Sequence, residues 1–349
     1  MAEQLRRPVS NQAEPGRAGS ARVGAVGEQF AELVTRGRLE VGLPGRGATA
    51  ARWRLLAELA GDDLDVARLA EAHLDALAIL DELEMPALVG EGSRWAVWAA
   101  EPPNARVAAE RDPDGRWKLT GVKRWCSGAH ACTDALVTAD TAAGGRLFAV
   151  DLSQDGVHAG DGGWLGLGMA GCGTENVEFV AVPAVPVGVP RAYLDRVGFW
   201  LGAIGVAACW YGGAVEVGRP LWQAARGGGL DPHARAHLGV VDTVLSAAKL
   251  ALRDAAEAAD RAGNPSASAD ADLRYWRRRA LGVRAVVEAA ATTTIERVGR
   301  ALGPAPLATD AAHSRRVTDL GVYLRQSHAE RDLAALADLA AAADRWQPW

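Results

Sequence analysis

The sequence predicts an α+β protein of several domains, in which a helical N-terminal domain and a C-terminal four-helix bundle flank an antiparallel β-barrel or β-sandwich. Three observations support this fold class. Apolar residues recur at helical spacing in the first part, short β-like runs follow, and long helical blocks fill the remainder. The 349 residues are enough for two or three folding units. The predicted divisions are a disordered tail over 1–20, the helical domain over 21–92, the β domain over 93–190 and the bundle over 191–349.

The N-terminal domain is predicted from one helical face. Asp62 or Asp63 is placed to cap this helix, and Met85-Pro86 ends it. His73 lies on the apolar stripe, where a hydrogen-bonded core histidine is expected. The preceding tail is rich in Pro, Gly, Ser and Arg, a composition typical of disorder. The stripe has spacings of three and four residues and consists of Val66, Leu69, Ala70, His73, Leu74, Leu77 and Leu80.

Short runs of β-forming residues, broken by Gly, Pro and Asp, predict the β domain. Gly121 is expected to make a tight turn between two short antiparallel strands. The second of these strands ends at Trp125-Cys126-Ser127, and alternation would place the Trp125 and Ser127 side chains on one face. The runs lie at 95–99, 117–125, 135–139, 147–152 and 177–182.

Four helical blocks predict the C-terminal bundle, near 193–225, 232–262, 271–301 and 314–344, with Gly-rich or Pro-rich breaks between them. The segment 197–215 carries no charge and is long enough to cross a bilayer. Its internal glycines, and the amphipathic helices that follow it, favour a helix buried in the bundle or in an oligomer. We therefore expect no membrane span, and the apolar segment is an argument for a homodimer or homotetramer.

Composition excludes some classes of protein. The net charge of −5 and the pI of about 5.9 give no basic field for nucleic acid or an anionic membrane. No apolar segment of a secretory signal follows Arg6 and Arg7. Four cysteines without CxxC spacing are typical of free thiols in a reducing cytosol, so a cytoplasmic protein is expected: Cys126, Cys132, Cys172 and Cys209.

Two glycine patterns and a histidine pair lack the context that a site would need. The GxGxx(G/A) patterns at 45–50 and 166–171 do not sit in a strand-turn-helix unit, so a Rossmann dinucleotide site is not expected. His233 and His237 are four residues apart on a predicted helix without an evident third ligand, so no metal site is expected.

The segment Trp125-Cys126-Ser127 suits a flavin. An isoalloxazine ring needs a large flat apolar neighbour that excludes water and a small hydrogen-bond donor at its edge. Trp125 and Ser127, at the end of one predicted strand, would supply these two groups.

The same segment resembles the acyl-CoA dehydrogenase family. That family carries Gly-x-Lys-x-Trp followed by a small residue and a hydroxyl residue, here Gly121, Lys123, Trp125, Cys126 and Ser127. The order of a helical domain, a β domain and a long helical bundle is similar over about residues 25–343. Further similar positions in the β domain are 147–151, Gly168-Met169, Thr174 and 177–183.

The resemblance implies FAD as the cofactor. It implies that Trp125 screens the flavin ring and that Ser127 replaces a family threonine whose hydroxyl binds the N5 edge of the ring. The cofactor-binding residues implied in this way are Trp98, Ala100, Trp125, Cys126 and Ser127.

The chain departs from the family pattern at several positions. The family loop T-E-P-x-x-G-S-D appears at 100–104 as Ala-Glu-Pro-Pro-Asn, without its hydroxyl residues, and the Arg-x-x-Phe-Gly signature is absent from 219–235. The position of the family's catalytic glutamate falls at Ser327, and its alternative base position falls near Trp222 or Gln223. None of these residues is acidic, so the resemblance is to a divergent member of the family that lacks the usual base.

His328, beside Ser327, is the predicted replacement base because imidazole ionises near neutral pH. Glu101 is a weaker candidate. Gln326, Ser327 and His328 cluster uncharged polar groups in one predicted turn, as in helices that line a wet cavity, although a solvated face explains most polar residues of this block. Ser327 and His328 are accordingly the predicted catalytic residues.

The sequence thus predicts an FAD-dependent oxidoreductase that acts on an acyl thioester with a non-standard base. Two alternatives stay open: a reduced-flavin monooxygenase on the same fold, and a degenerate, non-catalytic member that serves as a binding or assembly subunit. The expected partners are a small-molecule substrate, further copies of the chain, and an electron-transfer protein or flavin reductase.

Overall fold

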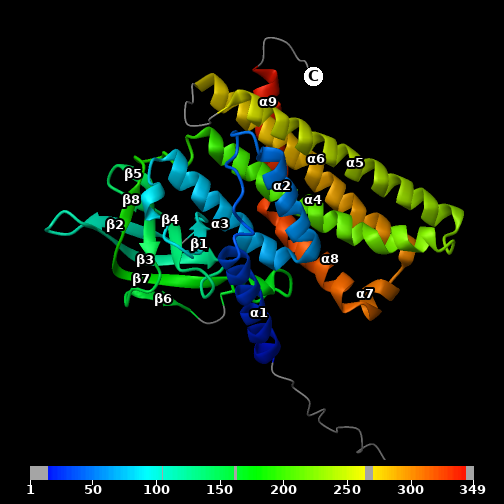
Figure 1. The fold of residues 1–349 in the computed structure, drawn as a ribbon, viewed down its shortest axis with the longest axis horizontal. Helices are drawn as coiled ribbons and strands as arrows, with labels where there is room; N and C mark the ends of the chain where they lie inside the picture. Colours follow the sequence, from blue (N-terminus) through cyan, green and yellow to red (C-terminus); the bar gives the residue numbers. More distant parts are fainter. Residues whose placement is uncertain (1–14, 104, 161–162, 264–269, 343–349) are drawn as a thin grey trace, which may run out of the picture.

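The computed structural model describes residues 15–103, 105–160, 163–263 and 270–342 (Figure 1). N-terminal helices, an eight-stranded sheet and long C-terminal helices follow one another along the chain, which confirms the α+β class. Figure 1 shows the sheet on one side, the C-terminal helices on the other, and helix α3 between them.

Three helices and a short 3-10 helix form the N-terminal part: α1 (Pro15–Thr35), α2 (Thr49–Asp62), α3 (Leu64–Glu82) and η1 (Pro86–Leu88). Residues 1–14 of the predicted disordered tail lie outside the described residues. Residues 15–20, assigned to the same tail, are helical instead, and Pro15 occupies the first position of α1, where a helix needs no amide donor.

Helix α3 contains the predicted apolar stripe, and most of its residues are buried. Of the two predicted caps, Asp63 is the one used: its carboxylate accepts hydrogen bonds from the Asp65 and Val66 amides. His73 is a core histidine, as expected, and its Nδ1 accepts a bond from the Trp95 amide at 3.2 Å. Burial lowers the pKa of His73 to about 4, so the ring is neutral near pH 7.

The middle part is one mixed sheet: β1 (Trp95–Trp98), β2 (Val107–Arg111), β3 (Trp117–Cys126), β4 (Asp134–Thr141), β5 (Gly144–Asp151), β6 (Val157–Ala159), β7 (Glu175–Pro183) and β8 (Val185–Val187). The strand order is β6-β7-β3-β2-β4-β5-β8, with β1 paired to β4. β4 runs parallel to β1 and β2, so the predicted antiparallel architecture is wrong at these pairs. The β2-β3 hairpin supplies the long crossover that a parallel pair requires. Among the described strands no pairing joins β6 to β8, and a closed barrel is not confirmed.

Strand β3 is continuous, which corrects the predicted turn at Gly121. β3 pairs with β2 on one side and β7 on the other, and its register with β7 shifts beside Gly121. Gly121 has a φ of 131°, and a Cβ there would overlap the Arg106 carbonyl oxygen. Glycine therefore permits a close approach of two strands at a bulge. The hairpin turn lies at 112–116, where Asp112 and Arg116 share a backbone bond.

The C-terminal part comprises α4 (Val197–Arg226), α5 (Pro232–Ala262), α6 (Asp270–Leu302), α7 (Ala305–Thr309), α8 (Ala311–Tyr323), η3 (Leu324–Gln326) and α9 (Glu330–Ala341). α4 packs against α2, α5, α6 and α8, as Figure 1 shows for the long helices. The last predicted helix, 314–344, is wrong in one respect: it is broken between Tyr323 and Glu330. Ala329 at this break has a φ of 45°, which an α-helix cannot contain.

Within the described residues, α4 is the one helix apolar enough to cross a membrane, and 67% of its apolar window is buried inside the molecule. A Cβ at Gly213 would lie 2.9 Å from the Leu64 side chain, so glycine allows the close packing of α4 on α3. The expected buried helix is therefore present. Because the chain itself covers α4, the apolar segment 197–215 is no longer an argument for a second copy.

We expect Gly121→Ala to lower the free energy of unfolding by about 2–4 kcal/mol, because the new methyl group adds a steric clash to an unfavourable backbone conformation. Urea denaturation followed by circular dichroism measures the change. Gly144→Ala is the matched control, since Gly144 has a φ of 106° but no atom within 4 Å of the position that a methyl group would take. Equal losses in the two variants would mean that the close approach of β2 and β3 contributes nothing.

Candidate active site

A cavity of about 870 Å³ lies where the three parts of the chain meet. Its walls come from α3, the ends of β1 and β3, the loop between β6 and β7, α4, α6, and the connection from α8 to α9. A cavity of this volume is large enough for a small organic molecule or a cofactor ring.

The end of β3 places Trp125 and Ser127 on one wall of the cavity, as predicted. The cause is a β-bulge and not simple alternation. The register of β3 with β7 shifts between Lys123 and Cys126, and Trp125 has a φ of 59°. The Trp125 indole borders the cavity, and 51% of the residue is exposed. Since this left-handed conformation costs of order 1 kcal/mol in a non-glycine residue, neighbouring bonds must hold it.

A pair of hydroxyl groups lies beside the indole. The Ser127 and Thr174 Oγ atoms are 3.0 Å apart, and the Trp98 indole N–H donates to the Ser127 carbonyl at 3.0 Å. Trp98 and Ala100, at the end of β1 and in the loop after it, also line the cavity. Four of the five predicted cofactor-binding residues therefore meet on this wall: Trp98, Ala100, Trp125 and Ser127.

Cys126 lies away from this wall. It is fully buried in the core of the sheet, its thiol donates to the Lys123 carbonyl at 3.3 Å, and it is not among the described residues that line the cavity. Burial raises the pKa of Cys126 to about 12, so the thiol stays neutral. Its two neighbours in the sequence, Trp125 and Ser127, line the cavity, whereas the Cys126 side chain points into the core of the sheet.

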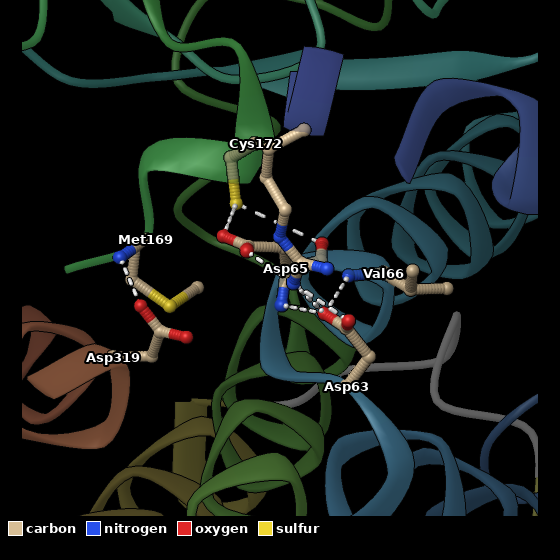
Figure 2. A network of polar contacts seen from close by, with 7 residues as sticks. Asp63, Asp65, Val66, Met169, Cys172 and Asp319 are labelled. Atoms are coloured by element: carbon tan, nitrogen blue, oxygen red, sulfur yellow. Dashed lines mark hydrogen bonds and ion pairs between the residues drawn. The ribbon is translucent and has the colours of Figure 1, made fainter. Parts of the chain in front are cut away.

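The loop before β7 forms another wall, and a polar network fixes it (Figure 2). Asp319 on α8 accepts from the Met169 amide at 2.7 Å, and the Cys172 thiol donates to an Asp65 carboxylate oxygen at 3.3 Å. Arg22 on α1 completes the network, with Nη2 2.6 Å from Asp63 and 2.8 Å from Asp65. Met169, Cys172 and Thr174 are thereby held at the cavity.

The two predicted catalytic residues occupy different positions. His328 lines the cavity, its Nδ1 is 3.4 Å from Asp332, and 59% of its side chain is exposed. Ser327 is not among the described cavity residues, and its Oγ accepts a bond from the Ala329 amide at 3.1 Å. Glu101, the weaker base candidate, is exposed and likewise absent from the described cavity lining.

Charged side chains that were not predicted as site residues line the end of the cavity that is formed by α3. We call this the inner end of the cavity. Arg68, Glu71 and Asp75 share one face of α3 and border the cavity. Arg68 Nη1 lies 2.7 Å from Glu71 Oε2, and both side chains are largely buried. Burial raises the pKa of Glu71 to about 7, while Arg68 opposes this shift. Arg284 from α6 donates to the Ala203 carbonyl at 2.8 Å.

The sequence contains a weak indication of this charged cluster, namely the spacing of its three residues on α3. Charges three and four residues apart on a helix normally form a solvated face, and that interpretation fits Arg68, Glu71 and Asp75 from the sequence alone. Only the packing of α4 against α3, with residues of α6 also lining the cavity, turns this face into an interior surface.

The two glycine patterns and the histidine pair, which were not expected to form binding sites, lie in loops and at helix ends. The glycine pattern at 45–50 lies between α1 and α2, apart from its last two residues, which begin α2, and the one at 166–171 lies between β6 and β7. His233 and His237 lie at the start of α5. Over residues 15–103, 105–160, 163–263 and 270–342, no group of three or more His, Cys, Asp and Glu side chains is arranged to hold a metal ion.

A search of protein-family models found no match, and no curated protein matched the sequence. Solved structures match over nearly the whole chain. TdsC from Paenibacillus sp. A11-2, in complex with FMN and indole, has a TM-score of 0.73 and 17% identity, covering 92% of this chain and 96% of TdsC. KijD3 in complex with FMN and dTDP-3-amino-2,3,6-trideoxy-4-keto-3-methyl-D-glucose has a TM-score of 0.72 and 18% identity, covering 95% of each chain. A nitrososynthase from Micromonospora carbonacea var. africana has a TM-score of 0.72 and 21% identity, covering 94% of this chain and 97% of that enzyme.

These matches define the class of fold, which is the acyl-CoA dehydrogenase-like fold of a group of flavin-dependent enzymes. At 17% to 21% identity the likeness concerns the fold alone. The resemblance found in the β domain of the sequence is thus confirmed at the level of architecture, over the helical parts as well as the sheet.

We expect Asp319→Asn to flatten the pH dependence of stability. Burial raises the pKa of Asp319 to about 6, so the folded state favours the protonated carboxyl. This contribution is present below about pH 4 and is lost as the pH rises through 6. Relative to the variant, the wild type should lose about 1–2 kcal/mol between pH 4 and 7 in urea denaturation.

Asp310→Asn provides the contrast of opposite sign. The backbone amide of His313, followed by that of Ala312, lowers the pKa of Asp310 at the start of α8, so its stabilising effect is lost as the pH falls. Parallel stability curves for wild type and Asp319→Asn would contradict the assigned role of Asp319.

Proposed function

We propose that the protein is a flavin-dependent oxidoreductase, and specifically a reduced-flavin monooxygenase that acts on a polar small molecule. The observation that carries this proposal is the cavity wall formed by Trp125, Ser127 and Thr174. A half-exposed indole fits the requirement for a flat apolar surface against an isoalloxazine ring, and two adjacent hydroxyl groups fit the polar edge of that ring.

The charged inner end favours a polar substrate over a fatty acyl chain. An apolar chain laid against Arg68, Glu71 and Asp75 would remove charged groups from water without replacing their hydrogen bonds, which is unfavourable. TdsC is a dibenzothiophene monooxygenase and another similar structure is a nitrososynthase, which supports oxygenation over the dehydrogenation of an acyl thioester. The acyl thioester remains the alternative substrate.

Each residue of the site has a distinct task in this proposal. Trp125 covers one face of the ring and excludes water, while Ser127 and Thr174 orient its edge. His328, at the exposed end of the cavity beside Asp332, orients or protonates groups that enter. When bound, the flavin supplies the redox chemistry.

The flavin is either FAD, as the sequence predicted, or FMN. The adenosine half of FAD needs its own binding groups, and the Arg-x-x-Phe-Gly signature is absent from 219–235. TdsC and KijD3 were solved with FMN. We therefore favour FMN, supplied in reduced form by a flavin reductase in a reducing, cytoplasmic setting.

A second copy of the chain remains a proposed partner, for a reason other than the apolar segment of α4. Leu165 and Leu167, in the loop between β6 and β7, are 94% and 88% exposed. Two such leucines, on either side of Gly166 in one loop, expose apolar surface that self-association would cover, which fits a homodimer or homotetramer.

We expect the wild type to bind FMN, and Trp125→Ala to weaken that binding about 10- to 100-fold, because the variant loses a stacking surface. Fluorescence titrations with FMN and FAD measure both affinities. Trp222→Ala is the matched control, since Trp222 on α4 is 44% exposed and is not among the cavity residues. Failure of the wild type to bind either flavin would overturn the enzymatic proposal in favour of a non-catalytic binding subunit.

We expect reduced FMN and oxygen to convert a ring compound such as indole, measured by oxygen uptake and product chromatography. His328→Ala should reduce this turnover about 10²- to 10⁴-fold if His328 transfers a proton. Bleaching of oxidised flavin by an acyl-CoA ester, without oxygen use, would instead support the dehydrogenase. Unchanged turnover would remove His328 from the mechanism.

A further inference from the structure

The inner end of the cavity combines a carboxylate with an unpaired cation. Glu71 uses only Oε2 to accept from Arg68, and no hydrogen bond from a described residue reaches its Oε1. The Arg284 guanidinium donates to the carbonyl oxygens of Ala203 and Gln326, and no carboxylate of the described residues lies within 4 Å of it. A carboxylate oxygen is therefore free to take a proton, while the Arg284 guanidinium, which lies over the Trp210 ring and is attracted by Asp332, Glu288 and Glu71, is bonded to no carboxylate of the described residues.

The groups around Glu71 keep both of its protonation states accessible near neutral pH. Burial raises the pKa of Glu71 to about 7, Arg68 and Arg284 lower it, and Asp75 raises it. A proton acceptor works best when its pKa lies near the working pH. The charged groups that face Glu71 are Arg52 from α2, Arg68 and Asp75 from α3, and Arg284 from α6, and the uncharged titratable groups are Tyr193, Cys209 and Tyr323.

The rest of the cavity suits a flat molecule. Trp98, Trp164 and Phe199 line it, and they come from β1, the loop before β7, and α4. Tyr323 also lines it, and its buried hydroxyl lies beside the Cys209 thiol. Aromatic walls with a charged inner end fit a small ring compound that carries one polar, ionisable group.

We propose that the inner end binds the weakly acidic O–H or N–H group of a small flat substrate, that Glu71 accepts its proton, and that Arg284 faces the resulting anion. The inference rests on the proposed function for the oxidation that follows. In the step itself, the substrate O–H or N–H bond breaks, an O–H bond forms on the Glu71 carboxylate, and the electron pair stays on the substrate atom. No oxidant is consumed, and Arg68 is a positioning residue that holds Glu71 through Oε2.

A proton-linked binding experiment tests this assignment without turnover. The probe is 4-nitrophenol, whose ionisation is visible in its absorption spectrum, added to the purified full-length protein at pH 6 and pH 8. Calorimetry in buffers of different ionisation enthalpy counts the protons exchanged. At pH 8 both the free probe and Glu71 are largely ionised, so binding should take up about one proton per site, because two adjacent acids then share one proton. At pH 6 the free probe and Glu71 are both largely protonated, so a complex that shares one proton should instead release about one proton per site.

Variants separate the contributions of the two residues. Glu71→Gln should bind the probe at pH 8 without proton uptake, whereas Glu71→Asp should keep the uptake. Arg284→Gln should weaken phenolate binding at pH 8 about 10- to 100-fold, because a charge-assisted contact is lost. Glu58→Gln, on the exposed face of α2, should match the wild type in every measurement.

Several outcomes would overturn the assignment. Wild-type protein that does not bind the probe, or that binds it without proton uptake at pH 8, excludes Glu71 as the acceptor even if the variants fail to fold. Undiminished uptake in Glu71→Gln does the same. The flavin titration of the same samples keeps the two proposals apart: normal flavin binding with no uptake removes only Glu71, and normal uptake without flavin binding removes only the oxidoreductase.

Discussion

The position of α3 between the sheet and α4 is the constraint on which the rest of this molecule depends. A helix covered on both sides has no solvated face, so its charged residues must find partners inside the protein. Arg68 pairs with Glu71 at 2.7 Å, Asp65 with Arg22 at 2.8 Å and Glu82 with Arg196 at 2.7 Å, and Asp75 borders the cavity. The same helix orders the loop before β7 through Asp65 and Cys172. Helix α3 therefore determines three properties of the molecule: how the sheet packs on the bundle, how polar the cavity is, and where the loop before β7 lies.

The sequence predicted the elements whose signals are local. The stripe of α3, its Asp63 cap and the core histidine His73 follow from spacing and side-chain chemistry that neighbours along the chain determine. The turn at Gly121 was wrong because the requirement for glycine comes from a strand that lies opposite in space, which no local pattern records. The final helix was wrong because helical periodicity continues through 324–329, while the backbone at Ala329 does not.

The candidate site divides in the same way. Trp125 and Ser127 could be predicted, since both sit at the end of one strand and carry the resemblance to a known family. Glu71 and Arg284 could not, because the two residues lie more than 200 positions apart in the sequence and look like surface charges until the folded chain brings both to the cavity. A distant resemblance thus transferred the architecture and the aromatic wall. The inner end of the cavity is charged and not apolar, and it became evident only from the packing of the helices in the folded structure.

The network of Arg22, Asp65, Cys172 and Asp319 also bears on how the protein matures. Its bonds join residues 107 and 150 positions apart, and contacts over such separations form late because closing a long loop is entropically costly. During synthesis the sheet and the N-terminal helices leave the ribosome well before α8. The wall formed by Met169 and Cys172 is then complete only when the C-terminal helices dock. The cavity therefore reaches its final shape only after the last helices of the chain have docked.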